Sequence, residues 1–356
     1  MTPSEALAHS AGAQPLGLSR PARDYSVFGG ILRSELDFPE LTPTRADSAN
    51  WTLHVAAEPA PDVSSIPLGE RRSGAEAYRL ARTPNGLRLD YSHGGVFDIS
   101  SDGHVIVWYR QAGASLELVR SIVLGPAVAL ALELSGFLCL HGSAVAIDGR
   151  AVAFLGAKHH GKSTLATALT RAGARLIGDD TLAISPGAPA CIRPGVPSVR
   201  LWQDAARELS VHNVCARVTD GVKTTASGFA RGVVLETEVE LNALYILAPQ
   251  RKEPQQCAVW RERLAPVPAT IALAHQMKLA DSLVGLRAAG GRLGTAAAVA
   301  RAVPVWRLHA VRDFVLLPVI VEQLFGWHAA AGRAAAAVGN ETTHTTMQRT
   351  TQEERL

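Results

Sequence analysis

The chain has 356 residues, of which 19% are charged, and its formal net charge is +3. Its length is enough for two ordinary domains with sizeable cores. So mild a charge balance argues against a nucleic acid or a membrane surface as partner. The four cysteines are scattered and form no CxxC pair, which indicates neither a disulfide framework nor a zinc knuckle, and a cytoplasmic location is expected.

The N-terminal third is predicted to be β-structure. Residues 1–23 are rich in Ala, Pro and Ser and show no secretory signal, so we expect a disordered leader. Apolar and polar residues then alternate in several short runs that turn sequences separate. The first run is expected to be a strand broken at Gly29-Gly30. The pattern predicts a small antiparallel β domain over residues 24–115.

A helix is expected over residues 116–136, ended by Gly136. The apolar run 122–140 is long enough to span a bilayer, but Glu133 lies inside it and Pro126 interrupts it. A carboxylate at the middle of a bilayer costs about 2.5 kcal/mol or more. We therefore interpret the run as a buried helix that leads into a strand.

The central feature of the sequence is a glycine-containing segment behind a predicted hairpin. Two apolar runs, 144–147 and 150–155, are joined by Asp148-Gly149, which is a strong hairpin signal. The second run leads into nine residues that fit the phosphate-binding pattern G-x-x-x-x-G-K-[ST] at every fixed position, and a helix-forming segment follows. The nine residues are Gly156, Ala157, Lys158, His159, His160, Gly161, Lys162, Ser163 and Thr164.

Strand, loop and helix in this order point backbone amides and the positive end of the helix dipole at an anion. Lys162 is then expected to reach the β- and γ-phosphates of a nucleotide, and the Ser163 hydroxyl to bind Mg²⁺. Lys158, His159 and His160 either add positive charge over a phosphate or face solvent. The two histidines also resemble a metal-ligand pair, although no cysteine or third histidine lies close in sequence. A glycine-bearing turn that fits the pattern by chance is the alternative.

Two acids follow the loop at short range. Asp179 and Asp180 lie seventeen and eighteen positions after Lys162, behind a short apolar pair. Adjacent strand residues point to opposite faces, so we expect the two carboxylates to have different roles. A helix cap or a turn is the alternative. Arg200, in a predicted loop over 193–202, is either a phosphate clamp or a surface arginine.

The remaining segments are predicted from their apolar patterns. We expect strands at 241–247 and 303–308, helical structure over 266–293 and 314–325, and a frayed or disordered tail from 329 to 356.

The combination of His141-Gly142, the hairpin, the loop and Asp179-Asp180 resembles the catalytic domain of HPr kinase/phosphorylase and its smaller relatives. The opening over residues 25–41 is similar to a subgroup described as lasso-peptide or serine kinases of biosynthetic gene clusters, and so are Arg200-Leu201-Trp202 and Arg312-Asp313-Phe314. The likeness extends over roughly residues 24–327. It implies an α/β P-loop domain of the HPr kinase C-terminal type, a mixed sheet with flanking helices, over residues 116–328 behind the small β domain.

The resemblance implies transfer of the γ-phosphoryl group of ATP to a hydroxyl. The regulatory enzyme's second signature and its usual N-terminal domain are not visible, so a serine of a peptide or small protein is the implied acceptor rather than HPr. By analogy, Asp179 accepts or orients the hydroxyl proton, and Asp180 holds Mg²⁺ together with Ser163. His141 is expected to tune the first acid or contact phosphate, or else to be a buried structural histidine.

Two other functions agree with the same residues. A nucleotide-binding switch needs the loop but no acceptor, and an accessory ATPase releases phosphate to water. The regulatory relatives form hexamers, so a homo-oligomer is one expectation.

Overall fold

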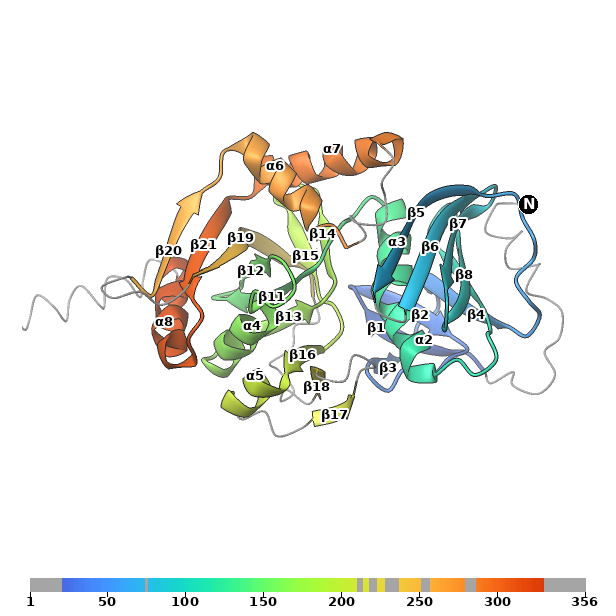
Figure 1. Ribbon diagram of the computed structural model, residues 1–356, viewed down its shortest axis with the longest axis horizontal. Helices are drawn as coiled ribbons and strands as arrows, with labels where there is room; N and C mark the ends of the chain where they lie inside the picture. The colour runs from blue at the N-terminus through green and yellow to red at the C-terminus, as the bar shows by residue number, and fades with distance from the viewer. Residues whose placement is uncertain are drawn as a thin grey trace, which may run out of the picture.

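The structure is a computed structural model, and it describes residues 21–73, 76–209, 214–217, 223–227, 237–250, 257–278 and 286–329. The predicted leader and tail therefore lie outside the described residues, apart from 21–23 and 329. Figure 1 shows a body formed around an N-terminal sheet on the right and a second body on the left.

The N-terminal sheet has nine strands in the order β3-β1-β2-β4-β9-β8-β7-β6-β5. Its strands are β1 (Arg23–Val27), β2 (Gly30–Ser34), β3 (Thr42–Thr44), β4 (Trp51–Ala56), β5 (Ile66–Ser73), β6 (Glu76–Thr83), β7 (Gly86–Tyr91), β8 (Gly95–Ser100) and β9 (Val105–Tyr109).

This sheet is mixed, which corrects the antiparallel domain that we predicted. Strand β4 pairs in parallel with both β2 and β9, because β3 and the β5–β8 meander intervene before the chain returns. The predicted first strand is likewise a hairpin. Phe28 and Gly29 have φ angles of 49° and 64°, and they reverse the chain between β1 and β2. Alternation of apolar and polar residues predicts a strand, but it does not predict which strand pairs with it or whether the pairing is parallel.

Three helical segments cover one face of the N-terminal sheet: α2 (Leu116–Ile122), a π-helical turn η1 (Val123–Ala127) and α3 (Val128–Leu134). Pro126 lies in the π-helical turn, where the lost amide donor is accommodated by a wider turn. Buried side chains of these segments share one core with Leu32, Phe97 and Trp108 of the sheet. The boundary at residue 115 stays a prediction, and the helices that follow it pack with the N-terminal sheet.

The apolar run 122–140 does not form one long helix. It continues from η1 and α3 into strand β10 (Leu138–Leu140). Across the described ranges, no helix is long and apolar enough to cross a membrane.

The second sheet is also mixed and holds the predicted hairpin. Its order is β10-β14-β15-β19-β12-β11-β13, and β21 continues beside β19 with β20 at its edge. The bounds are β11 (Gly142–Ile147), β12 (Arg150–Leu155), β13 (Arg175–Asp179), β14 (Leu182–Ser185), β15 (Cys191–Arg193), β19 (Val239–Gln250), β20 (Val259–Arg263) and β21 (Val305–Val311). Asp148 and Gly149, with φ angles of 47° and 80°, form the expected turn between β11 and β12.

Helices pack on both faces of the second sheet. On one face lie α4 (Lys162–Arg171) and α8 (Leu317–His328), which a 3₁₀ turn η3 (Phe314–Leu316) precedes. On the other face lie α6 (Pro266–His275) and α7 (Leu286–Ala302). Strand β12 is covered from both sides, with Phe154 in one core cluster and Leu155 in the other. Burial on both faces explains why this strand reads as a continuous apolar run.

A small third sheet and a short helix border the loop. The order is β16-β18-β17, with β16 (Ser198–Trp202), β17 (Val214–Arg217) and β18 (Lys223–Ser227), and α5 (Gln203–Glu208) follows β16. The loop predicted over 193–202 is therefore wrong in its second half. Pairing of β16 with β18 puts Arg200 and Trp202 on a strand despite the local Pro and Gly residues.

Candidate functional site

The segment 156–161, which we call the glycine loop, joins the end of β12 to the start of α4. Gly156 and Gly161 have φ angles of 145° and 89°, which side chains rarely allow. A Cβ on Gly156 would come within 3.2 Å of His160 Nδ1 and 3.3 Å of Leu247 Cβ, so the position also lacks room. The loop ends at the N-terminus of a ten-residue helix, where unpaired amides favour an anion.

Lys162 is buried beneath the glycine loop. Its Nζ donates to the backbone carbonyls of Gly156 at 2.8 Å and Ala157 at 3.0 Å. Its side chain is 7% exposed, so a full positive charge lies inside the curl of the loop. A bound anion is the natural counter-charge for this arrangement.

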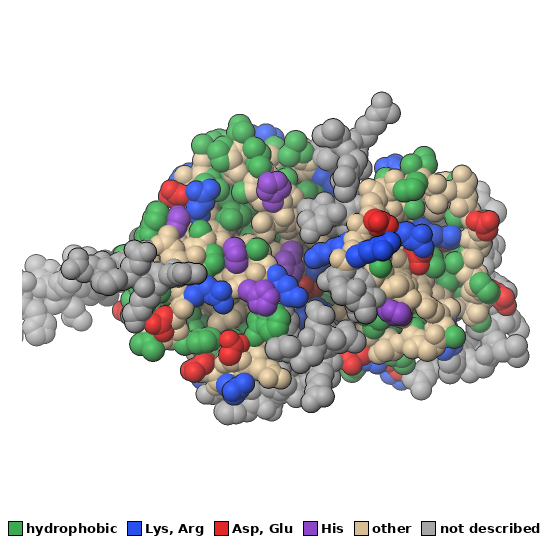
Figure 2. Space-filling view, viewed as in Figure 1, with side chains coloured by type: hydrophobic (Ala, Val, Ile, Leu, Met, Phe, Trp, Pro, Cys, Tyr) green, Lys and Arg blue, Asp and Glu red, His purple; other side chains and the backbone are tan. Residues whose placement is uncertain are grey.

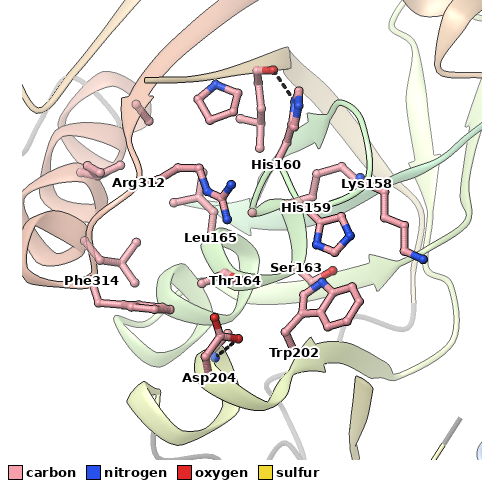
Figure 3. Close-up of a pocket in the computed structure, with 18 of the residues that line it drawn as sticks. Lys158, His159, His160, Ser163, Thr164, Leu165, Trp202, Asp204, Arg312 and Phe314 are labelled. Carbon is pink, nitrogen blue, oxygen red and sulfur yellow. Dashed lines mark hydrogen bonds between the residues drawn. The ribbon is translucent and has the colours of Figure 1, made fainter. Parts of the chain in front are cut away.

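The three unusual loop residues point in different directions (Figure 3). The His159 ring stacks on the Trp202 ring with centroids 4.5 Å apart, and Lys158 Nζ lies 5.7 Å from the centre of the same ring. His160 Nδ1 lies 3.1 Å from the Leu247 carbonyl and ties the loop to β19. The two histidines do not converge as a ligand pair. Within the described residues, no group of three His, Cys, Asp or Glu side chains forms a metal site.

Asp179 is the last residue of β13 and is 8% exposed. Its Oδ1 accepts hydrogen bonds from the Ser163 hydroxyl at 2.9 Å and the Ser143 hydroxyl at 2.5 Å. Its Oδ2 accepts from the backbone amide of Arg200 at 2.8 Å. The carboxylate therefore sits beside the first turn of α4, held by neutral donors. Sequence reasoning paired Ser163 with Asp180, whereas the structure joins Ser163 to Asp179.

Asp180 follows in a left-handed conformation with φ of 72°, which turns its carboxylate away from the line of β13. Three basic side chains surround it. Lys278 Nζ lies 2.6 Å from Oδ2, His141 Nδ1 lies 3.3 Å from Oδ1, and Arg200 Nη1 lies 3.9 Å from Oδ2. Loss of hydration opposes ionisation, but Lys278, Arg200 and His141 outweigh it and hold the pKa of Asp180 well below its usual range.

Arg200 connects this cluster to the N-terminal body. Its Nη2 donates to the Ser121 hydroxyl of α2 at 3.0 Å, so the guanidinium lies between α2 and Asp180. The Arg200 side chain is therefore held between two partners, and it also lines the cavity that the glycine loop borders.

Two residues that contact the acids were not predicted from the sequence. Ser143 is directly opposite Asp179 in the pairing of β11 with β13, so a correct strand register would have found it. Lys278 follows α6 and is 98 positions from Asp180, and nothing local to it distinguishes it from a surface lysine. The Lys278 amide donates to the Cys139 carbonyl at 2.9 Å, which fixes this end of α6 beside β10.

The two acids line one cavity together with Lys162, His141 and Arg200, and its volume of about 500 Å³ is within the usual range for small-molecule sites. Figure 2 shows histidine and basic side chains gathered around the middle of the left-hand body on this face. The lining includes His141, Lys158, His159, His160, Gly161, Lys162, Ser163, Thr164, Asp179, Asp180 and Arg200. The cavity continues past Leu165 to the ends of β19 and β21 and the start of α8.

A search of solved structures finds similarity to the HPr(Ser) kinase/phosphatase from Coxiella burnetii. The match has 14% sequence identity and a TM-score of 0.28, and it covers 53% of this chain and 95% of the other. No protein-family model and no curated protein matches the chain. So low a TM-score leaves the function to be inferred from the geometry of the site itself.

Proposed function

We propose that this chain is an ATP-dependent kinase that transfers the γ-phosphoryl group to a hydroxyl, with a serine of a peptide or small protein as acceptor. One observation carries the proposal. An anion cradle with a buried lysine and two carboxylates of different character open into the same cavity. Phosphoryl transfer depends mainly on positioning and on charge stabilisation, and these are the groups that supply both.

The glycine loop is proposed to hold the triphosphate. Its amides and the N-terminus of α4 face the phosphates, and the Lys162 ammonium neutralises charge on the β- and γ-phosphates. In the structure the ammonium is held by the carbonyls of Gly156 and Ala157. Phosphate oxygens are better partners than carbonyls for an ammonium, because the hydrogen bonds are then charge-assisted on both sides.

The residues around Ser163 fit a magnesium ion. Mg²⁺ prefers oxygen ligands and is commonly bound by one or two carboxylates together with substrate phosphates. The Ser163 hydroxyl and the Asp179 carboxylate are 2.9 Å apart and supply this donor set. When bound, the ion would neutralise charge between the β- and γ-phosphates. The hydrogen bonds thus favour Asp179 as the metal-side acid, in place of Asp180.

Asp180 is then left for the acceptor side. Its depressed pKa keeps it ionised, so the carboxylate can accept a hydrogen bond from the attacking hydroxyl and orient it. The new O–P bond forms as the bond from the γ-phosphorus to the ADP oxygen breaks, and the hydroxyl proton is released to water. His141, whose Nδ1 lies 3.1 Å from the Asp180 carbonyl, helps to fix that residue. Lys278 and Arg200 lie beside Asp180, and the proposal assigns their positive charges to the stabilisation of charge that develops during transfer.

The proposal is tested with γ-labelled ATP and a panel of peptides and small hydroxyl compounds. Lys162→Ala should abolish labelling of any acceptor that the natural chain modifies, because the triphosphate loses its buried counter-charge. Lys158→Ala is the matched control, since it removes a loop lysine that lies over the Trp202 ring and should retain most activity. Full labelling of an acceptor by the Lys162→Ala variant would contradict the proposed mechanism. Phosphate released only into water would favour the accessory ATPase instead.

A further inference from the structure

The end of the cavity farthest from the two acids has no role in the chemistry proposed above. It is apolar and comes from four elements: α4, β19, β21 and α8. Its buried side chains are Leu165, Leu247, Leu308 and Ile320. A triphosphate leaves this space unfilled, because phosphates seek the amides and cations at the other end.

One wall of this space is formed by strands β19 and β21, which extend beyond the end of β12. In the sheet, Leu155 at the end of β12 is opposite Ile246 of β19, which is opposite Arg307 of β21. Both strands then continue for four more residues, to Gln250 and Val311. At about 3.3 Å per residue the extension is roughly 13 Å long. Ligands of parallel α/β sheets bind beyond the carboxyl ends of the strands, which is where this wall stands.

Two side chains of the turn after β21 border the space (Figure 3). The Arg312 amide donates to the Gln250 carbonyl at 3.2 Å, and the Asp313 carboxylate accepts from the Val315 amide at 2.9 Å. These bonds fix the backbone that carries Arg312 and Phe314. Phe314 is 38% exposed, although it lines the cavity, and Figure 3 shows the Arg312 side chain reaching into the cavity toward Leu165.

An aromatic ring and a guanidinium beside an apolar slot suit a flat heteroaromatic ring. Bases stack on both groups, and stacking accepts any base because each has a π face. We infer that this end of the cavity is the base subsite, in which the nucleobase lies against Phe314 and Arg312. The inference rests on the proposed function, because it requires the triphosphate to occupy the glycine loop.

Two probes separate the base subsite from the phosphate cradle: Mg-ATP and magnesium tripolyphosphate, which has the phosphate chain but no base. Binding of each is measured by calorimetry. Phe314→Ala should weaken Mg-ATP binding about tenfold, as expected for the loss of one stacking contact, and change tripolyphosphate binding by less than about twofold. Arg312→Ala should lower the affinity for Mg-ATP more than that for tripolyphosphate. Val315→Ala is the matched control, since Val315 is 78% exposed and is not part of the cavity lining.

The outcomes distinguish the two proposals. If the natural chain binds neither probe, the phosphate cradle and the proposed function fail together. If it binds both and Phe314→Ala leaves the ratio of the two affinities unchanged, the base subsite is wrong while the cradle stands. An equal loss of both probes in Phe314→Ala also overturns it, because the variant then perturbs the fold rather than a base contact.

Discussion

Two neighbouring carboxylates in this site are held by opposite kinds of partner. Asp179 is satisfied by neutral donors, two hydroxyls and a backbone amide, which leaves its negative charge available to a cation. Asp180 is already paired with Lys278 and lies near Arg200 and His141. The difference arises from one left-handed residue at the end of β13. This difference in partners is the physical reason why we propose Asp179 as the Mg²⁺ ligand and Asp180 as the residue that contacts the acceptor hydroxyl.

The pair of Lys278 and Asp180 should be strongly coupled. Lys278→Met and Asp180→Asn should each lower the free energy of unfolding by about 1–3 kcal/mol, because each leaves a partly buried charge without its partner. The double variant should lose at least about 1 kcal/mol less than the sum of the two. Urea unfolding measures all three.

The matched control for this cycle is a surface pair. Arg307 and Glu262 are 2.7 Å apart with side chains 47% and 43% exposed, so their coupling should stay below about 1 kcal/mol. Strictly additive losses at Lys278 and Asp180 would show that the contact adds nothing to stability.

At the scale of elements, short sequence patterns correctly predicted those helices, strands and turns whose signal lies within the element itself. Asp148-Gly149 predicted the hairpin because both residues tolerate positive φ, and the structure confirms it. The strands at 241–247 and 303–308 and the helix near the C-terminus are confirmed as well, with shifted ends. A strand that is buried on both faces of a sheet has a continuous apolar sequence, which makes it easy to recognise.

Non-local pairing accounts for what could not be predicted. The parallel neighbours of β4, the strand that carries Arg200 and Trp202, and the contact of Lys278 with Asp180 all join segments far apart in the chain. No local pattern encodes them. The sequence singled out the glycine loop and both acids because the proposed chemistry needs particular residues at short spacing, whereas the roles proposed for the two acids depend on the backbone of Asp180.

At the scale of the whole molecule, α2, η1 and α3 lie between the two sheets (Figure 1). They complete the core of the N-terminal sheet and also touch the second body. Ser121 accepts from Arg200, and Glu133 of α3 pairs with Arg292 of α7. The N-terminal body therefore contacts the second body beside Asp180 and also at Glu133.

The Glu133 pair should make stability depend on pH. Burial raises the pKa of Glu133 to about 7 despite the opposing charge of Arg292. A carboxyl whose pKa is raised by folding binds more protons in the folded state. Its contribution to the free energy of unfolding is therefore full below about pH 4.5 and is lost as the pH rises through about 7.

The test compares the natural chain with Glu133→Gln by urea unfolding at several pH values. From pH 4.5 to pH 8, the natural chain should lose on the order of 2–3 kcal/mol relative to the variant. His328, whose pKa burial lowers to about 4, contributes the opposite slope, but it does so equally in both chains. Parallel pH profiles would contradict a raised pKa of Glu133 in the folded protein.

The most direct measurement of the central claim compares Mg-ATP binding with phosphoryl transfer in Asp179→Asn. The amide keeps the shape of the carboxylate and can still accept from Ser163, so the triphosphate should bind to the glycine loop. Without Mg²⁺, the variant should bind ATP within about tenfold of the affinity of the natural chain. It should lose the gain in affinity that Mg²⁺ provides, and phosphoryl transfer should slow by about 100-fold or more. Transfer at the natural rate in Asp179→Asn would contradict the proposed role of Asp179, because the carboxylate beside Ser163 would then have no part in the reaction.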